Sequence, residues 1–343
     1  MDSLIDILKR LLPDVVEIIQ KRYQILRYVQ IMQPVGRRSL SQSLHMSERV
    51  LRGEIDFLKD QDLLSVSTAG MTLTEEGQKI LEKMADVMRD ITSLPEYERQ
   101  LEKHLGIKQC IVVSGNSDKS SWVKAEMGRA CLNSIKKHLE EENIIAVTGG
   151  TTMAAVADAL TPDFGGKKLL FVPARGGIGT DVKNQANTIC EKMAEKTNAN
   201  HMVLYVPDQV SADTYESFVN EPSINEVLRK IKSANVLIHG IGDALTMAKR
   251  RKTSQEELEM IQNGKAAAEA FGYYFNENGE IVHRVRTVGL KLEDLANISH
   301  IYAVAGGTSK AKAIKAYMKI APENTVLVTD EAAAKVLLKV KNF

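Results

Sequence analysis

Residues 143–160 read NIIAVTGGTTMAAVADAL, and this stretch decides the fold of the larger part of the chain. The apolar run Ile144 to Val147 predicts a buried strand, and the segment from Thr151 onward predicts a helix. Gly149 and Gly150 allow a tight turn whose backbone can come close to a ligand. Because amides at the start of a helix attract anions, the stretch predicts a strand, an anion-binding turn and a helix.

Similar apolar runs, each followed by a polar or helical segment, recur from Ile107 to the end of the chain. They are QCIVVSG, KKLLFVPA, HMVLYVP, ANVLIHGIG, HIYAVAGG and NTVLVTD. Strands that alternate with helices predict a mostly parallel sheet covered on both faces. We therefore expect an α/β domain here.

The carboxyl ends of parallel strands meet at one edge of an open sheet, which is where α/β proteins bind ligands. A second Gly-Gly-Thr turn, in AGGTSKAKAI, brings Lys310 to this edge, and VPARGG brings Arg175. Neither turn has the spacing of a nucleoside triphosphate or dinucleotide loop, so we expect a simple phosphate group. The residues that the motifs assign to it are Gly149, Gly150, Thr151, Thr152, Arg175 and Lys310.

Three further polar residues read first as ordinary exposed side chains. Gln185 follows VPARGG, where it can reach a sugar hydroxyl but is also typical of a solvated helix. Arg250 belongs to the basic cluster 249–252, in which one arginine can serve a second phosphate. Glu269, in GKAAAEAFGYYFN, lies among small residues where an exposed charge is common. His239 and other lone histidines in apolar strands are interpreted as structural.

The N-terminal part predicts a winged helix-turn-helix. Residues 10–32 place apolar side chains at a helical period, with Pro13 in the first turn. GRRSLSQSL and ERVLRGEIDFLKDQ follow as two short helices around a tight break, with Ser47 as the N-cap of the second. LLSVSTAGMTLTEEG then predicts a two-stranded hairpin.

A length of 343 residues is consistent with two domains of ~150 residues or more. We place the boundary near Pro95. Residues 1–95 are expected to form the winged helix-turn-helix with a connecting helix, and residues 96–343 to form the α/β effector and oligomerisation domain.

The chain carries 45 basic and 44 acidic side chains, so its formal charge of +1 excludes a polycation. Basic residues instead cluster between residues 21 and 52, where Glu48 is the single acidic residue. Because the N-terminal residues of a recognition helix enter the major groove, this cluster predicts DNA binding. A solvated charged face is the alternative. The expected DNA contacts are Arg37, Arg38, Ser47, Glu48, Arg49 and Arg52.

Other site types find little support in the sequence. Cys110, Cys131 and Cys190 are widely spaced, which argues against a disulfide framework and a structural zinc site. No apolar run approaches the ~20 residues of a membrane span. We expect a cytoplasmic protein that needs no metal, cofactor or membrane.

Seven motifs together resemble the SorC-type family of sugar-sensing transcriptional repressors. They are GRRSLSQSL, ERVLRGEIDFLK, MTLTEEG, VTGGTTMAAVA, VPARGG, GIGDA and AGGTSKAKAI. The resemblance covers nearly the whole chain, and it implies an effector domain related in fold to glucosamine-6-phosphate deaminase and ribose-5-phosphate isomerase. It further implies fructose 1,6-bisphosphate as inducer and, as target, a glycolytic operon headed by the glyceraldehyde-3-phosphate dehydrogenase gene.

The resemblance also adds Gln185, Arg250 and Glu269 to the sugar-phosphate contacts. It implies a homo-oligomer that forms a tetramer on operator DNA. Dimers alone already suit a palindromic or repeated operator, because two recognition helices need half-sites about one helical turn, or a multiple, apart.

A second hypothesis is a sugar-phosphate isomerase or deaminase with an accessory N-terminal domain. Its proton transfers would require a carboxylate and a histidine beside the phosphate turns. Residues 206–222, VPDQVSADTYESFVNEP, contain carboxylates but no compact histidine–carboxylate arrangement. We therefore favour binding without turnover and assign no catalytic residue.

Overall fold

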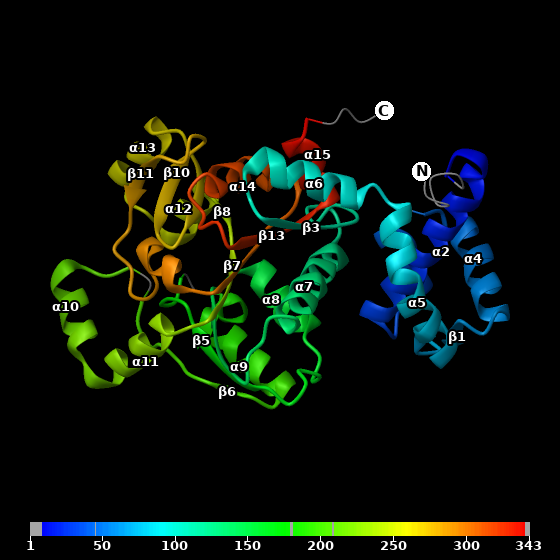
Figure 1. Cartoon of the computed structure of the whole chain (residues 1–343), viewed down its shortest axis with the longest axis horizontal. Helices are drawn as coiled ribbons and strands as arrows, with labels where there is room; N and C mark the ends of the chain where they lie inside the picture. Colours follow the sequence, from blue (N-terminus) through cyan, green and yellow to red (C-terminus); the bar gives the residue numbers. More distant parts are fainter. Residues whose placement is uncertain (1–8, 45, 179–180, 208, 340–343) are drawn as a thin grey trace. The chain divides into compact units, whose positions relative to one another are not determined.

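The computed structural model describes residues 9–44, 46–178, 181–207 and 209–339. The chain divides into two compact units, Met1–Glu96 and Tyr97–Phe343, whose elements are labelled in Figure 1. No helix in the described ranges is long and apolar enough to cross a membrane.

The N-terminal unit is a winged helix-turn-helix, as predicted. Its elements are α2 (Pro13–Met32), α3 (Arg37–Leu44), α4 (Glu48–Asp60), β1 (Leu64–Ser67), β2 (Gly70–Leu73) and α5 (Glu75–Ile91). Pro13 starts α2, where its missing amide hydrogen costs nothing. The helices pack around fully buried apolar side chains, including Ile25, Leu40, Leu51 and Leu81.

The wing is an antiparallel hairpin that is tied to the chain before α3. Val35 pairs with Met71 through two backbone hydrogen bonds of 2.9 and 3.1 Å. Gly70 has a φ of +132°, and a Cβ on it would lie 2.9 Å from the Val35 nitrogen. Glycine is therefore required at Gly70 by both its conformation and the close approach of the neighbouring strand.

The C-terminal unit is built on a seven-stranded parallel sheet in the order β3-β13-β12-β7-β4-β5-β6. Its strands are β3 (Gln109–Val113), β4 (Glu142–Val147), β5 (Lys168–Pro173), β6 (Asn200–His201), β7 (Val236–Gly240), β12 (His300–Val304) and β13 (Thr325–Asp330). The central strands are buried on both faces, which explains their continuous apolar runs. The predicted α/β fold with a mostly parallel sheet is confirmed.

Helices cover both faces of this sheet (Figure 1). One face carries α7 (Ser121–Lys136), α8 (Thr151–Ala159) and α9 (Ala186–Thr197), and the other carries α11 (Pro222–Lys232), α14 (Ala311–Met318) and α15 (Glu331–Leu337). At the edge, α6 (Leu94–Leu105) covers β3. Its side chains Glu98 and Glu102 accept hydrogen bonds from the amides of Val112 and Cys110, both at 2.9 Å, so this edge strand is not left open.

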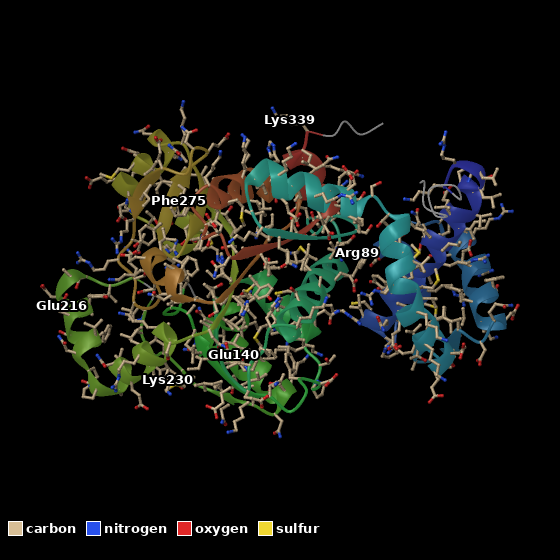
Figure 2. The ribbon with its side chains drawn as sticks, viewed as in Figure 1. Arg89, Glu140, Glu216, Lys230, Phe275 and Lys339 are labelled. Carbon is tan, nitrogen blue, oxygen red and sulfur yellow. The ribbon has the colours of Figure 1, made fainter. Side chains whose placement is uncertain are left out.

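A second sheet was not predicted. It is antiparallel, with the order β11-β10-β9-β8. Its strands are β8 (Gly242–Asp243), β9 (Ala266–Ala270), β10 (Tyr273–Asn276) and β11 (Ile281–Arg284), flanked by α12 (Ala244–Arg251) and α13 (Gln255–Asn263). Figure 2 labels Phe275 on β10, which is fully buried. Alanine and glycine favour strands weakly, so these segments gave little signal.

The strand predicted at HMVLYVP was wrong for most of its length. Only Asn200 and His201 form β6, and the following residues leave the sheet. Pro207 pairs as an isolated bridge with Gly177. Helix α10 (Ala212–Asn220) then projects from the unit, and none of its residues is buried.

The chain reverses its direction of travel across the sheet between two neighbouring strands. From β4 it moves outward to β5 and β6, whereas from β7 it moves toward β12 and β13. Loops that leave adjacent strands in opposite directions open a crevice at the carboxyl edge. The loops after β4 and β7 begin at Thr148 and Ile241, so the fold predicts a ligand site between them.

Candidate functional sites

The first candidate site is the exposed surface of α3 and the start of α4. Arg37, Arg38, Arg49 and Arg52 are all exposed there. Glu48 is 67% exposed, and its carboxylate lies 3.9 Å from Nε of Arg38. Four guanidinium groups on a helix-turn-helix form a surface suited to DNA phosphates and base edges.

Ser47 begins α4 as predicted. Its Oγ accepts a hydrogen bond from the Val50 amide at 3.3 Å. The N-cap prediction is confirmed, and the role of Ser47 in contacting DNA stays a prediction.

Two residues of the predicted basic cluster, Lys21 and Arg22, are engaged with a neighbouring helix. Arg22 donates from Nε to Glu54 at 2.8 Å, and its guanidinium lies 3.5 Å above the Phe57 ring. Nζ of Lys21 lies 3.8 Å from the same carboxylate. These cations join α2 to α4, so the charge count of the segment overstated the cationic surface.

Val50 is a residue that the sequence reasoning missed. It is 46% exposed in the first turn of α4, beside Arg49. It is out of phase with Leu51, Ile55 and Leu58, which form the buried face, and this mismatch was the available signal. An exposed valine at this position suits contact with a thymine methyl group.

The second candidate site is a cavity at the carboxyl edge of the parallel sheet, where the chain reverses direction. Residues that follow β4, β5, β7 and β12 line it, together with residues of α12 and β9. The cavity brings together the predicted ligand residues Gly149, Gly150, Thr151, Thr152, Arg175, Arg250, Glu269 and Lys310. Of the predicted set, Gln185 alone does not line it.

The turn after β4 leaves the start of α8 open to this cavity. Gly150 has a φ of +121° and supplies no side-chain cap. A Cβ on Gly149 would lie 2.7 Å from the Asn184 oxygen, so the turn packs tightly against the next segment. The amides of Thr151 and Thr152 carry the partial positive charge of the helix start, and both residues line the cavity.

The second Gly-Gly-Thr turn differs from the first. The Gly307 amide donates to Asp330 at 2.7 Å, and the Ser309 amide and hydroxyl donate to Asp118 at 2.9 and 2.7 Å. The protein's own carboxylates therefore occupy this turn. Lys310 is the residue through which the second turn reaches the cavity.

Lys310 lies in a cationic environment. Burial, together with the positive charges of Lys124 and Arg250, lowers the pKa of its ammonium group below the ordinary value, against the opposite pull of Asp118 and Asp243. A bound anion would relieve this repulsion and favour the charged form. The site is electrostatically prepared for an anion.

Glu269 is not the exposed charge that its small neighbours suggested. It is 4% exposed, and its Oε1 accepts hydrogen bonds from Nη2 of Arg251 at 2.8 Å, Nη1 of Arg175 at 3.3 Å and the Gly272 amide at 2.8 Å. Burial alone would raise the pKa of this carboxyl, but the two guanidinium groups outweigh burial and hold the pKa below its ordinary value. Glu269 is therefore an ionised group that fixes two arginines.

Arg251 was counted in a solvated cluster and has a different role. Its side chain is 2% exposed, and Nη1 also donates to the Tyr274 hydroxyl at 3.0 Å. Its neighbour Arg250 is exposed and lines the cavity. Adjacent residues of α12 thus have different roles: Arg251 is buried and structural, whereas Arg250 lines the ligand cavity.

Gln185 does not line the cavity but forms hydrogen bonds with a residue that does. Its amide oxygen accepts from the Ile178 nitrogen at 3.0 Å, and its amide nitrogen donates to the Ile178 oxygen at 2.8 Å. Ile178 lines the cavity. The structure therefore places Gln185 as a residue that holds the lining loop.

His239 is a buried neutral group on β7, next to Gly240, which lines the cavity. Its Nδ1 is 3.0 Å from the Gly240 oxygen, and its Nε2 is 3.1 Å from the Tyr317 hydroxyl. Burial lowers its pKa to about 4. These contacts agree with the structural interpretation.

Among the described residues, no cluster of three or more His, Cys, Asp or Glu side chains is arranged to hold a metal ion. Cys110, Cys131 and Cys190 are buried free thiols, and burial raises the pKa of each. They are core residues whose thiols have low reactivity.

Two family descriptions match consecutive parts of the chain. Residues 18–88 match the "CggR N-terminal DNA binding domain", and residues 89–339 match the "Putative sugar-binding domain". Both matches fall on the units that carry the two candidate sites.

Two relatives match nearly the whole chain. The Central glycolytic genes regulator of Bacillus subtilis (strain 168) is 56% identical over 339 residues, which is 99% of each chain. The protein of the same name from Priestia megaterium is 54% identical over 340 residues, again 99% of each chain.

Solved structures agree with the fold. A "putative SorC family transcriptional regulator" from Enterococcus faecalis is 48% identical with a TM-score of 0.68, over 71% of this chain and 99% of that one. The full-length sorbitol operon regulator SorC from Klebsiella pneumoniae has 16% identity and a TM-score of 0.68, over 95% and 98%. The second likeness supports the fold alone.

Proposed function

Because the chain belongs to the SorC family of sugar-binding transcriptional regulators, we propose that it represses a glycolytic operon and releases the operator when fructose 1,6-bisphosphate binds. The glyceraldehyde-3-phosphate dehydrogenase gene heads the proposed operon. The names of the two relatives that match over 99% of their length support a role in central glycolysis.

The chain is a DNA-binding and sugar-binding regulator rather than an enzyme. Its close relatives are regulators, and residues 18–88 match a DNA-binding domain. The hypothesis of an isomerase or deaminase with an accessory domain is therefore wrong.

One observation carries the choice of ligand: positively charged groups from separate elements line the same cavity. They are the start of α8, Arg175, Arg250 and Lys310, and the charge of Arg250 is among the causes that lower the pKa of the Lys310 ammonium group. A sugar with two phosphates would pair with more of these positive groups than a singly phosphorylated sugar would. The buried carboxylate of Glu269 supplies an acceptor for a sugar hydroxyl.

The cavity has a volume of about 100 Å³. Small-molecule sites usually span roughly 300–1,000 Å³, so we expect a sugar bisphosphate to widen the cavity as it enters. A ligand that binds the widened form better shifts the protein toward that form. Such coupling between two sites is typically worth ~1–3 kcal/mol, enough to weaken operator binding 5- to 150-fold.

We place this regulation in the cytoplasm, in a homo-oligomer that brings paired recognition helices to the operator. The exposed Arg37, Arg38, Arg49 and Arg52 would then contact DNA phosphates and base edges in each half-site. Ligand-driven movement in the effector unit would alter the spacing of these helices. No metal or cofactor takes part in this scheme.

Calorimetric titration with a panel of glycolytic intermediates tests the ligand. We expect fructose 1,6-bisphosphate to bind more tightly than fructose 6-phosphate. We also expect Arg250→Ala to lower the affinity for the bisphosphate by about tenfold, or ~1.4 kcal/mol. Lys312→Ala, which removes an exposed lysine with a side chain 80% accessible, is the matched control. Equal affinity for the two sugars, or an unchanged affinity in Arg250→Ala, would refute the assignment.

A further inference from the structure

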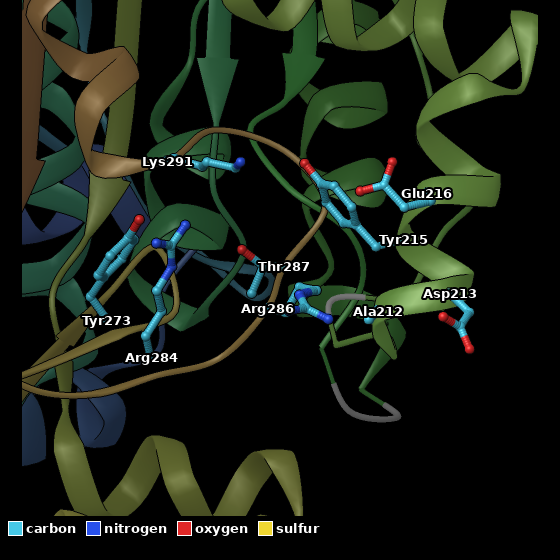
Figure 3. A pocket seen from close by; sticks show the side chains of 9 residues that line it. All are labelled: Ala212, Asp213, Tyr215, Glu216, Tyr273, Arg284, Arg286, Thr287 and Lys291. Carbon is cyan, nitrogen blue, oxygen red and sulfur yellow. The ribbon is translucent and has the colours of Figure 1, made fainter.

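A second cavity, of about 410 Å³, has no part in the proposed function. It lies between α10 and the segment that runs from the end of β11 to Lys291. Figure 3 shows Lys291 on that segment extending toward Tyr215 and Glu216 on α10, and Arg284 beside Tyr273; Arg286 also lines the cavity. Its volume falls within the roughly 300–1,000 Å³ of small-molecule sites.

The charges of this cavity favour an anion. Three cations line it, and one of them, Arg284, is partly balanced by Glu293 at 3.8 Å. Of the two carboxylates in the lining, Glu216 points toward Lys291, whereas Asp213 points away (Figure 3). Arg286 is exposed. Positive charge therefore exceeds negative charge where a ligand would sit.

Aromatic rings accompany the cations. Arg284 lies 4.7 Å above the ring of Tyr273, whose hydroxyl donates to Glu293 at 3.0 Å. Tyr273 thus fixes the position of Arg284. The ring of Tyr215 lies 5.5 Å from Nζ of Lys291 on the opposite wall, and Tyr215 is only partly buried. A planar ligand group can stack on Tyr215 while an attached anionic group reaches the cations.

We propose that this cavity binds a mononucleotide. The phosphates would contact Lys291 and Arg286, and the base would stack on Tyr215. The Glu216 carboxylate would accept a hydrogen bond from a ribose hydroxyl, as acidic residues do in dinucleotide sites. The volume exceeds what a phosphate ion alone would fill, which favours a ligand with a ring.

Backbone hydrogen bonds join the segment that lines the nucleotide cavity to a segment that lines the sugar-phosphate cavity. The segment that carries its cations is hydrogen-bonded to the chain on either side of Arg175: Leu290 donates to Ala174 at 2.8 Å, and Gly176 donates to Val288 at 3.0 Å. Arg175 itself pairs with Gly289 across the same bridge.

Isothermal titration of adenosine diphosphate into the full chain tests the proposal, with pyrophosphate as a phosphate-only probe. We expect saturable binding of the nucleotide and weaker binding of pyrophosphate. Lys291→Ala and Tyr215→Leu should each lower the affinity for the nucleotide by about tenfold. Lys232→Ala, at an exposed lysine outside the cavity, should bind like the unaltered chain.

Lys310→Ala separates this proposal from the proposed function, because it alters the other cavity. Nucleotide affinity should survive in that variant. The proposal is overturned if the nucleotide does not bind, if pyrophosphate binds as tightly, or if Lys310→Ala abolishes binding that Lys291→Ala leaves intact. Circular dichroism melting of each variant confirms that lost binding is not lost folding.

Discussion

Arg251 donates a hydrogen bond from Nη2 to Oε1 of Glu269 at 2.8 Å, and the two side chains are 2% and 4% exposed. The same oxygen accepts from Arg175, which lines the sugar-phosphate cavity. A buried pair of this kind adds little net stability, but the loss of one partner leaves a charge without compensation. Glu269 therefore holds a ligand-directed cation in a fixed position.

Glu269→Ala should lower the free energy of unfolding by about 3 to 5 kcal/mol, because two guanidinium groups would remain buried beside an apolar side chain. Urea denaturation followed by the fluorescence of Trp122 measures this, since the single tryptophan lies in the C-terminal unit. Glu256→Ala, at an exposed position, is the control and should change stability by less than about 0.5 kcal/mol. Equal stability of the two variants would show that the buried pair is dispensable.

Arg52→Ala should weaken operator binding and reduce the slope of log K against log salt by about 0.9, because one phosphate contact and its released counterion are lost. Arg22→Ala should leave that slope unchanged, since Arg22 is engaged with Glu54 and Phe57. Fluorescence anisotropy titrations between 50 and 200 mM salt, the range over which such contacts are usually compared, measure both. A slope that changes in Arg22→Ala but not in Arg52→Ala would place the DNA surface elsewhere.

Stability should fall on acidification through His239. Burial depresses its folded-state pKa from 6.5 to about 4, so the unfolded chain binds a proton in this range before the folded chain does. The contribution is complete above pH ~6.5 and is lost as pH falls toward ~4, by about 3 kcal/mol in all. Urea denaturation at several pH values should show a shallower acid slope for His239→Phe. Parallel pH profiles for the two proteins would rule out this role.

Gln185→Leu should lower the affinity for the sugar bisphosphate without removing a ligand contact. The variant loses both hydrogen bonds to Ile178, so the loop that lines the cavity opens more easily. Hydrogen exchange of residues 176–178 should become faster, and ligand affinity should fall by about tenfold. Reduced affinity with unchanged exchange would mean that Gln185 contacts the sugar directly.

Much of the fold follows from local sequence pattern. The central strands read as continuous apolar runs because helices cover both faces, and the N-terminal helices carry their own caps and period. The antiparallel sheet was missed because its strands contain alanine and pair with one another rather than with the main sheet. The relation to the deaminase and isomerase fold stays a prediction.

The candidate site was predictable where a motif supplies its own geometry. The turn at Gly149 and Gly150 is local, so its place at the start of a helix could be read from the sequence. The burial of Glu269 could not, because it depends on Arg175, which lies 94 residues earlier in the chain. The hydrogen bond from the Ser309 amide to Asp118 joins residues 191 positions apart, so local sequence pattern could not predict it either.

The central claim is that an anion held beside Lys310 controls the affinity of arginines on α3 and α4 for DNA. Anisotropy titration of operator DNA, with and without fructose 1,6-bisphosphate, tests it most directly when the unaltered chain is compared with Lys310→Ala. The account predicts equal operator affinity for both proteins without sugar, and a loss of affinity on adding sugar for the unaltered chain alone. An equal response of both proteins to the sugar would contradict it.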